Sequence, residues 1–123
     1  VVTSVNDNEA RNIGRESHTD HDIRYDRADE FMKAVLGHWD SWDDDAIVVD
    51  KVNNLYAHPH KVRRIDYKGE YLSSRGPFTV PRSIQGHPVV IQAGGSPRGE
   101  KFATRWGELI FAGYRSQQVG KVE

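Results

Sequence analysis

The sequence predicts an α/β fold in which short apolar strands alternate with helices. Residues 88–92 and 109–112 are apolar runs of strand length, and they flank a segment with helical periodicity. Strands that alternate with helices favour a parallel sheet with right-handed crossovers, either an open doubly wound sheet or part of a barrel. A closed eight-stranded barrel needs about 250 residues, so a chain of 123 residues could hold roughly half of one.

The first residues predict the end of a strand followed by a loop. Residues 1–4 (VVTS) are typical of the last positions of a strand, and position 1 is Val rather than Met. We therefore expect the chain to be a fragment of a longer protein. Residues 6–22 are rich in Asn, Asp, His and Glu, with Gly14 as a helix breaker, and they predict a loop with at most a short helical turn.

An amphipathic helix is predicted from Tyr25 onward. Its apolar side chains recur with the i, i+3, i+4, i+7 spacing of one helix face. They are Tyr25, Ala28, Phe31, Met32, Val35, Leu36 and Trp39. Residues 42–45 (WDDD) end this pattern.

Residues 46–86 show no helical period but several turn signals, and we interpret them as an insertion. Residues 64–73 predict a hairpin with a tight turn at residues 68–69. A third short strand is expected at residues 78–80, where Pro81 limits its length.

The chain then returns to the pattern of strand, helix and strand. Residues 88–92 (PVVIQ) predict a strand that is buried on both faces of a parallel sheet. Ser96 is a good N-cap, Pro97 fits the first helical position, and Gly107 ends the helix. Residues 109–112 predict another buried strand.

Composition excludes several classes of function. With 17 basic and 18 acidic residues and no basic block among aromatic residues, electrostatic nucleic-acid binding has little support. The longest apolar run is far shorter than the roughly 20 residues of a membrane-spanning helix. The absence of cysteine excludes disulfides, thiolate metal ligands and thiol nucleophiles. We expect a cytoplasmic protein.

The turn after residues 88–92 is the most informative part of the sequence. Gly94 and Gly95 allow a ligand to approach the backbone closely, and Ser96 places a helix N-terminus directly behind them. The free amides and the dipole of a helix N-terminus attract anions, which predicts a site for a phosphate-bearing ligand. An ordinary tight turn is the alternative.

Two side chains of the first helix are candidates for the same site. His21 and Tyr25 are four residues apart at the start of that helix, so they share one helix face. If the strands are parallel, the loops after Ser4 and Gln92 emerge at one edge of the sheet and bring both side chains to Ser96. A helix-capping histidine and a tyrosine in ordinary packing are the alternative interpretation.

Other polar clusters lack the spacing of known sites, and we expect no metal. The clusters are His18, His21, His58 and His60; Asp43, Asp44 and Asp45; and Ser73, Ser74 and Ser83. The histidines lack a partnering glutamate at metal-ligand spacing. The aspartates lack the spacing of a calcium loop, and the serines lack a nucleophile-elbow context. Arg63, Arg64 and Arg75 suit either a carboxylated substrate or a solvated surface.

Six short segments in consistent order resemble a known family. They are residues 24–31 (RYDRADEF), 39–42 (WDSW), 67–70 (YKGE), 75–77 (RGP), 80–82 (VPR) and 92–94 (QAG). These segments resemble the flavin-dependent monooxygenases that oxidise nitrilotriacetate, EDTA and dibenzothiophene sulfone, which belong to the bacterial-luciferase-like superfamily. The resemblance covers residues 1–112.

The resemblance implies a (β/α)8 TIM barrel, of which residues 1–123 form a single segment with an insertion at about 46–86. It implies reduced FMN (FMNH2) as cofactor, supplied by a separate NAD(P)H-dependent flavin reductase. The reaction would oxidise a small organic substrate, such as an aminopolycarboxylate or an organosulfur compound, with O2. The resemblance is also compatible with a homo-oligomer.

The residues that match the family's cofactor-binding positions are His21, Tyr25, Gly95 and Ser96, and the resemblance assigns no catalytic residue to this chain. Family members also hold the flavin ring with residues from earlier strands, which would precede Val1. A truncated, catalytically inactive fragment or interaction module is therefore the second hypothesis. A different phosphate-binding barrel, such as a sugar-phosphate enzyme, is the third.

Overall fold

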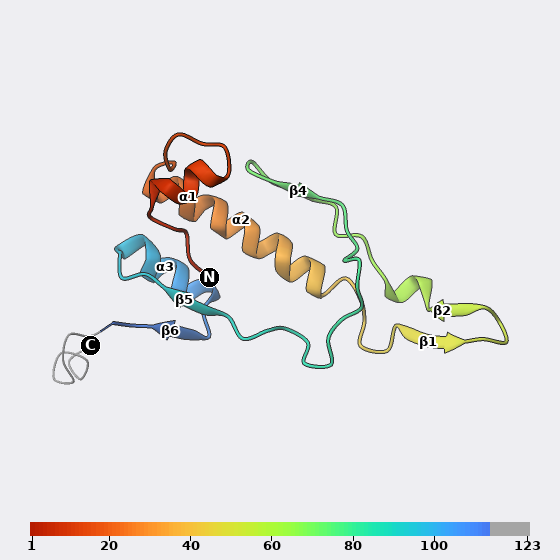
Figure 1. Ribbon diagram of the computed structural model, residues 1–123. Helices are drawn as coiled ribbons and strands as arrows, with labels where there is room; N and C mark the ends of the chain where they lie inside the picture. Colours follow the sequence, from red (N-terminus) through yellow and green to blue (C-terminus); the bar gives the residue numbers. More distant parts are fainter. Residues whose placement is uncertain (114–123) are drawn as a thin grey trace. The chain divides into compact units, whose positions relative to one another are not determined.

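A computed structural model describes residues 1–113. The described chain divides into two compact units (Figure 1). The first combines Val1–Tyr25 with the chain from Val89 onward, and the second is Asp26–Pro88. Among the described residues, no helix is both long and apolar enough to span a membrane.

The first unit contains the predicted βαβ element. Strand β5 (Ile91–Ala93), helix α3 (Pro97–Trp106) and strand β6 (Leu109–Phe111) follow one another, and β5 pairs with β6 in parallel (Figure 1). Val1 extends this pairing, because its amino group donates to the Ile91 carbonyl and its own carbonyl accepts from the Ala93 amide at 3.5 Å. The prediction of parallel strands is therefore confirmed.

The ends of α3 are set by the residues that the sequence analysis named. The Ser96 side chain caps the helix by accepting the Gly99 amide, and Pro97 occupies the first turn. Gly107 closes the helix through a bond from its amide to the Ala103 carbonyl. Phe102 and Ala103, on the apolar side of the helix, are buried.

The predictions that residues 88–92 are buried on both faces and that residues 109–112 form a buried strand are wrong for the described residues. In β5, Gln92 is 1% exposed whereas Ile91 is 48% exposed, so one face is covered and the other is open. Leu109, Ile110 and Phe111 of β6 are exposed. A parallel strand becomes buried on both faces only when elements cover both, and the described part of this unit covers one.

Residues 6–22 contain slightly more helix than expected. Helix α1 (Asp7–Asn12) begins at Asn6, whose side chain accepts the Asn8 amide, and a loop follows it. Helix α2 (His21–Trp39) includes the predicted helix and starts four residues earlier than Tyr25. Tyr25 and Met32 are buried as the periodicity predicts, whereas Phe31 is 52% exposed.

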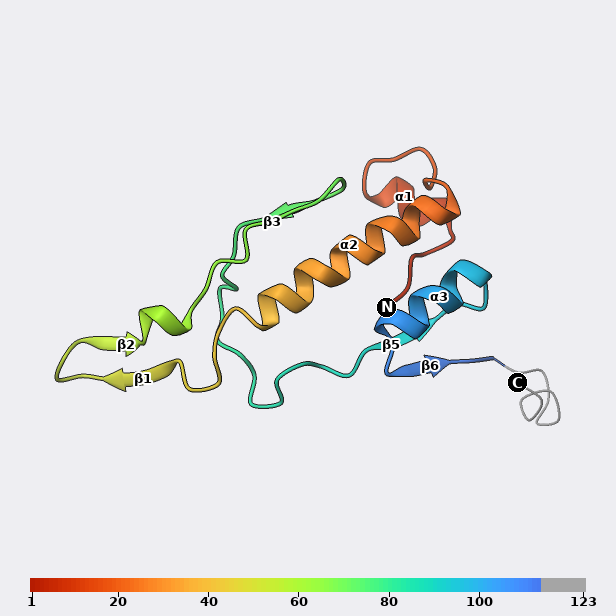
Figure 2. The same ribbon diagram turned by 180° about the vertical axis from the view of Figure 1, so that it is seen from behind.

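The second unit holds two hairpins. Strands β1 (Ile47–Asp50) and β2 (Leu55–Ala57) form the first, which the sequence analysis missed (Figure 2). Its strands are short and irregular, with a register shift and a positive φ of 48° at Val49, so they lack the alternation by which strands are recognised. A 3-10 turn, η1 (Pro59–Lys61), follows it.

The second hairpin pairs β3 (Tyr67–Lys68) with β4 (Ser73–Ser74). The hairpin was predicted, but its tight turn at residues 68–69 is wrong, because Lys68 pairs with Ser73 and the chain turns over residues 69–72. The wider loop forms around the Glu30 carboxylate, which accepts the amides of Glu70, Tyr71 and Leu72 at 2.7, 2.9 and 3.2 Å.

The strand predicted at residues 78–80 does not form. The backbone groups of Phe78 form hydrogen bonds with side chains rather than with a neighbouring strand. Its amide donates to the Ser41 hydroxyl at 2.9 Å, and its carbonyl accepts from the Trp42 indole at 2.9 Å. Because its amide and carbonyl are already bonded, Phe78 cannot use them to pair with another strand.

Candidate functional site

A cavity of about 330 Å³ lies in the first unit, at the carboxyl end of β5. It is lined by Val2, Thr3, Ser4, Val5, His21, Tyr25, Ala93, Gly94, Gly95 and Ser96. All four residues expected to bind a cofactor, His21, Tyr25, Gly95 and Ser96, therefore lie on one cavity. Parallel pairing explains this, because the chain leaves Val1 and β5 at the same edge of the sheet.

Ser96 joins the cavity to the start of α3. Its hydroxyl oxygen accepts the Gly99 amide at 3.1 Å and lies 3.1 Å from Nε2 of His21. The Ser96 side chain satisfies one amide at the start of α3. Amides of a first helical turn that have no such partner carry partial positive charge. An anion in this cavity would thus face a polar wall of a hydroxyl, an imidazole and a helix N-terminus.

His21 lies between two oxygen-bearing side chains. Its Nδ1 is 2.8 Å from a carboxylate oxygen of Asp22, and its Nε2 faces Ser96. The imidazole also contacts the edge of the Tyr25 ring, with ring centroids 5.1 Å apart. The side chain is 43% exposed, which leaves it accessible from the cavity.

Tyr25 is buried, and its hydroxyl lies against two glycines. A Cβ atom at Gly94 would lie 2.7 Å from the Tyr25 hydroxyl, and one at Gly99 would lie 2.6 Å from it. Such contacts are too close for any side chain, so glycine is required at both positions while Tyr25 keeps its place. The Tyr25 ring also contacts Phe102, with ring centroids 5.6 Å apart, which anchors it to the apolar face of α3.

Gly95 has different surroundings from the other two glycines. A Cβ atom added there meets nothing within 4 Å, although the residue lines the cavity. The backbone at Gly95 therefore leaves open space that a ligand can use. This is the arrangement expected where a ligand approaches the main chain closely.

Sequence reasoning missed several residues around this cavity. The Ser4 hydroxyl lies 3.2 Å from Nε2 of His18, and the Arg98 guanidinium lies 5.5 Å from the centre of the Tyr25 ring. Asp22 was missed as well, although its place beside His21 in the sequence was a usable signal. Ser4 was recognisable as the last residue of a predicted strand, whereas the position of Arg98 depends on how α3 packs on Tyr25.

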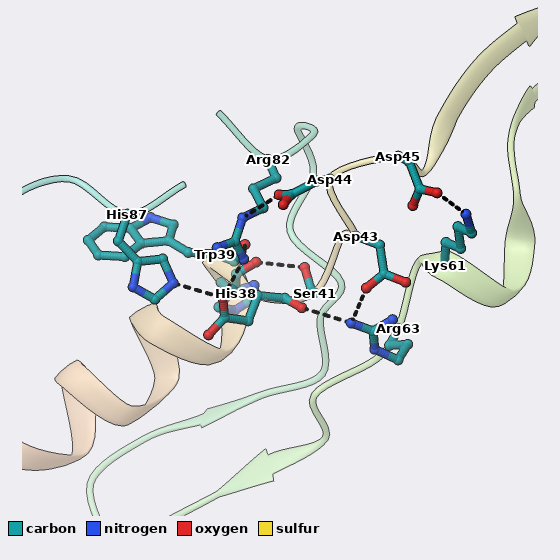
Figure 3. Close-up of polar contacts among 11 residues, drawn as sticks. His38, Trp39, Ser41, Asp43, Asp44, Asp45, Lys61, Arg63, Arg82 and His87 are labelled. Carbon is teal, nitrogen blue, oxygen red and sulfur yellow. Dashed lines mark hydrogen bonds and ion pairs between the residues drawn. The ribbon is translucent and has the colours of Figure 1, made fainter. Parts of the chain in front are cut away.

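The acidic run after α2 is a network of ion pairs in the second unit (Figure 3). Asp43 lies 2.6 Å from Arg63, Asp44 lies 3.0 Å from Arg82, and Asp45 pairs with Lys61. Each of the three carboxylates is therefore compensated by a cationic side chain of the same unit. Among residues 1–113, no group of three or more His, Asp or Glu side chains is placed to hold a metal ion.

Asp40, at the end of α2, pairs with Arg82 and with His87, whose Nε2 lies 2.8 Å from its carboxylate. Partial burial raises the pKa of its carboxyl, but hydrogen bonds from His87 and Arg82 outweigh this, so the pKa lies below its ordinary value. Arg63 and Arg64 are also engaged by carboxylates, Arg64 with Asp66 at 2.6 Å. Both guanidinium groups thus pair with carboxylates of the chain itself.

Comparisons with known proteins agree on one family. Residues 1–121 match the family described as luciferase-like monooxygenase. The chain is 57% identical over 112 residues to the dibenzothiophene-sulfone monooxygenase of Rhodococcus erythropolis, covering 91% of this chain and 25% of that protein. It is 44% identical over 121 residues to the nitrilotriacetate monooxygenase component A of Aminobacter aminovorans, covering 98% of this chain and 27% of that protein.

The fold is similar to that of a solved relative. The crystal structure of a riboflavin lyase with modified FMN and its substrate riboflavin matches with a TM-score of 0.79 and 44% identity. The match covers 87% of this chain and 24% of that one. The chain thus spans about a quarter of the length of the relatives that it matches.

Proposed function

We infer a flavin-dependent function from one premise: the chain belongs to the luciferase-like monooxygenase family. We propose that it contributes the phosphate-binding part of the flavin site of a two-component, FMN-dependent monooxygenase. The observation that carries the proposal is the shared cavity of His21, Tyr25, Gly95 and Ser96. The related riboflavin lyase was crystallised with modified FMN, which gives independent support.

The residues present fit a flavin phosphate. A phosphate needs donors and positive potential, and the cavity offers the Ser96 hydroxyl, the His21 imidazole and the N-terminus of α3. The open space at Gly95 allows phosphate oxygens to approach the backbone. The buried Tyr25 hydroxyl adds a neutral donor that the Gly94 and Gly99 backbone keeps in place.

In the proposed mechanism, this chain binds and orients while the cofactor supplies the redox chemistry. Reduced FMN, when bound, activates O2 for transfer of one oxygen atom to an organic substrate. Ser96, His21 and the first amides of α3 hold the phosphate end, and so limit the positions that the rest of the cofactor can take. The apolar side chains Val2 and Val5 line the cavity beside these polar groups.

The remaining parts of the proposal concern the whole enzyme. We propose that β5, α3 and β6 belong to a (β/α)8 barrel, and that residues 1–123 are one segment of it with an insertion at about 46–86. An NAD(P)H-dependent flavin reductase in the cytoplasm would supply the reduced FMN. The names of the relatives support an organosulfur compound or an aminopolycarboxylate as substrate.

A binding experiment tests this function without requiring turnover. FMN, oxidised and then anaerobically reduced, is titrated into the chain while flavin fluorescence and absorbance are recorded. We expect saturable binding that Ser96→Gly weakens. Glycine is nearly as good an N-cap as serine, so this change removes the hydroxyl and costs only a few tenths of a kcal/mol of helix stability. Ser83→Gly, which alters an exposed serine of the other unit, is the matched control.

Two further ligands separate the alternatives. Ribose 5-phosphate that binds as tightly as FMN would favour a general phosphate-binding barrel. A folded chain that binds neither ligand would contradict the proposal and favour an interaction module. That second candidate is favoured by one observation, the exposed apolar side chains of β6.

A further inference from the structure

A chain of hydrogen bonds connects a surface carboxylate to the cavity. Asp22 lies 2.8 Å from Nδ1 of His21, His21 Nε2 lies 3.1 Å from the Ser96 hydroxyl oxygen, and that oxygen accepts the Gly99 amide at 3.1 Å. A carboxylate can only accept, so Nδ1 carries the proton in this arrangement. Nε2 is therefore the nitrogen that faces the cavity.

We propose that Asp22 is a positioning residue for anion binding at this cavity, acting through His21. The proposal rests on the phosphate site described above. With Nδ1 held by Asp22, the imidazole presents Nε2 beside Ser96, where it can donate to a phosphate oxygen once it is protonated. The carboxylate fixes the direction of the imidazole ring.

The alternative is that Asp22 acts only through its charge. It is an acidic residue in the first turn of α2, a position favoured by the helix dipole alone. A carboxylate beside an anion site also repels a phosphate. If charge alone matters, removing Asp22 makes phosphate binding tighter, whereas loss of a positioning contact makes it weaker. The two explanations therefore predict opposite signs.

Glu100 is a matched control for this comparison. It is an exposed acidic residue in the first turn of α3, the helix that Ser96 caps. Glu100→Ala removes the same charge from the first turn of a helix. It leaves the contact between Asp22 and His21 in place.

The experiment measures the dissociation constants of FMN and riboflavin for four forms of the chain. They are the unsubstituted chain, Asp22→Ala, Asp22→Glu and Glu100→Ala. We expect Asp22→Ala to weaken FMN binding by about two- to fivefold, the range of an exposed ion pair, and to leave riboflavin binding unchanged. Glu100→Ala should leave FMN binding equal or tighter, and Asp22→Glu should restore most of the loss.

A second measurement reports on the imidazole itself. The ¹⁵N chemical shifts of the His21 ring report the hydrogen bond at Nδ1, so Asp22→Ala should alter them in the free chain, whereas Glu100→Ala should leave them unchanged.

The possible outcomes test the positioning role of Asp22 and the proposed flavin site separately. Equal or tighter FMN binding by a folded Asp22→Ala chain would overturn the positioning role and leave the flavin site intact. Failure of the unsubstituted chain to bind FMN would overturn the proposed function, and the role of Asp22 with it. Circular dichroism of all four forms shows that a loss of binding does not reflect unfolding.

Discussion

Gly95 and Gly99 lie on either side of Ser96 in the sequence but have contrasting surroundings. A Cβ atom meets nothing at Gly95, whereas at Gly99 it would lie 2.6 Å from the Tyr25 hydroxyl and 3.0 Å from the Gly94 carbonyl. One glycine thus leaves space for a ligand, and the other leaves space for a neighbouring side chain. Substitutions at the two positions should have separable effects.

We predict that Gly95→Ala changes ligand binding and not stability. The free energy of unfolding should stay within about 0.5 kcal/mol of the unsubstituted chain, because the new methyl group contacts nothing in the free protein. FMN affinity should fall, because the methyl group enters the space next to the cavity. Gly99→Ala is the contrasting variant, with an expected loss of about 1–3 kcal/mol from overpacking against Tyr25. Urea denaturation and FMN titration measure the two quantities, and unchanged FMN binding by Gly95→Ala would remove Gly95 from the site.

Arg98 provides a second prediction at this scale. Its guanidinium lies 5.5 Å from the centre of the Tyr25 ring, so its positive charge is close to the cavity wall. We expect Arg98→Gln to weaken FMN binding by about two- to fivefold at low salt, and by less at high salt, where exposed charges are screened. Fluorescence titration at two salt concentrations measures this. A loss that is equal at both concentrations would indicate packing rather than charge.

At the scale of elements, one helix side chain organises a hairpin loop. The Glu30 carboxylate of α2 accepts three consecutive amides of the loop between β3 and β4. A Cβ atom at Gly69 would overlap that carboxylate, so glycine there leaves room for the Glu30 contact. The wide loop is therefore a consequence of tertiary structure.

We predict that Glu30→Ala loosens this loop more than Glu30→Gln does. Alanine removes every acceptor, whereas glutamine keeps a carbonyl oxygen that can accept at least one amide. Hydrogen exchange at the amides of Tyr71 and Leu72 should be fastest in Glu30→Ala, slower in Glu30→Gln and slowest in the unsubstituted chain. Gly69→Ala should resemble Glu30→Ala, because the methyl group displaces the carboxylate. Equal exchange rates in all four forms would show that these bonds do not hold the loop.

The same carboxylate predicts a dependence on pH. Partial burial raises the pKa of Glu30, but hydrogen bonds from the amides of Tyr71, Glu70 and Leu72 outweigh this and hold it below its ordinary value. Because the pKa is lower in the folded than in the unfolded state, Glu30 stabilises the fold above its ordinary pKa of about 4.3. That contribution is lost as the pH falls through the folded pKa. An NMR titration of the Glu30 carboxyl carbon checks this, and a midpoint at or above the ordinary value would contradict it.

At the scale of the whole molecule, the described part of the sheet exposes apolar side chains. Leu109, Ile110 and Phe111 of β6 are 55%, 61% and 73% exposed, and Ile91 of β5 is 48% exposed. Neighbouring apolar side chains on a strand with an open edge promote association between chains. The rest of a barrel would cover them in the proposed enzyme.

We predict that the isolated chain self-associates with increasing concentration. Ile110→Lys combined with Phe111→Lys should reduce the association, because charged side chains oppose edge-to-edge contact. Sedimentation velocity over a concentration series measures it, and Val52→Lys with Tyr56→Lys, on the exposed β1–β2 hairpin, is the control. A monomer at every concentration would show that the open face of the sheet does not drive association.

Much of the fold was predictable because its signals are local. The Ser96 cap, the first-turn Pro97 and the closing Gly107 set both ends of α3 through contacts within a few residues. The β1–β2 hairpin and the true turn of the second hairpin were not predictable. Their strands are short, and the loop over residues 69–72 depends on Glu30, which lies far earlier in the chain.

The sequence by itself determined the type of each long element, the glycine turn and helix cap at residues 94–96, and four of the residues that line the cavity. Capping, periodicity and glycine content are properties of neighbouring residues, so they are visible without a fold. Only the tertiary structure decided that His21 Nε2 meets Ser96 while Nδ1 meets Asp22, and that the Tyr25 hydroxyl requires glycine at two separate positions. These contacts join residues up to 75 positions apart, and parallel strand pairing is what brings them together.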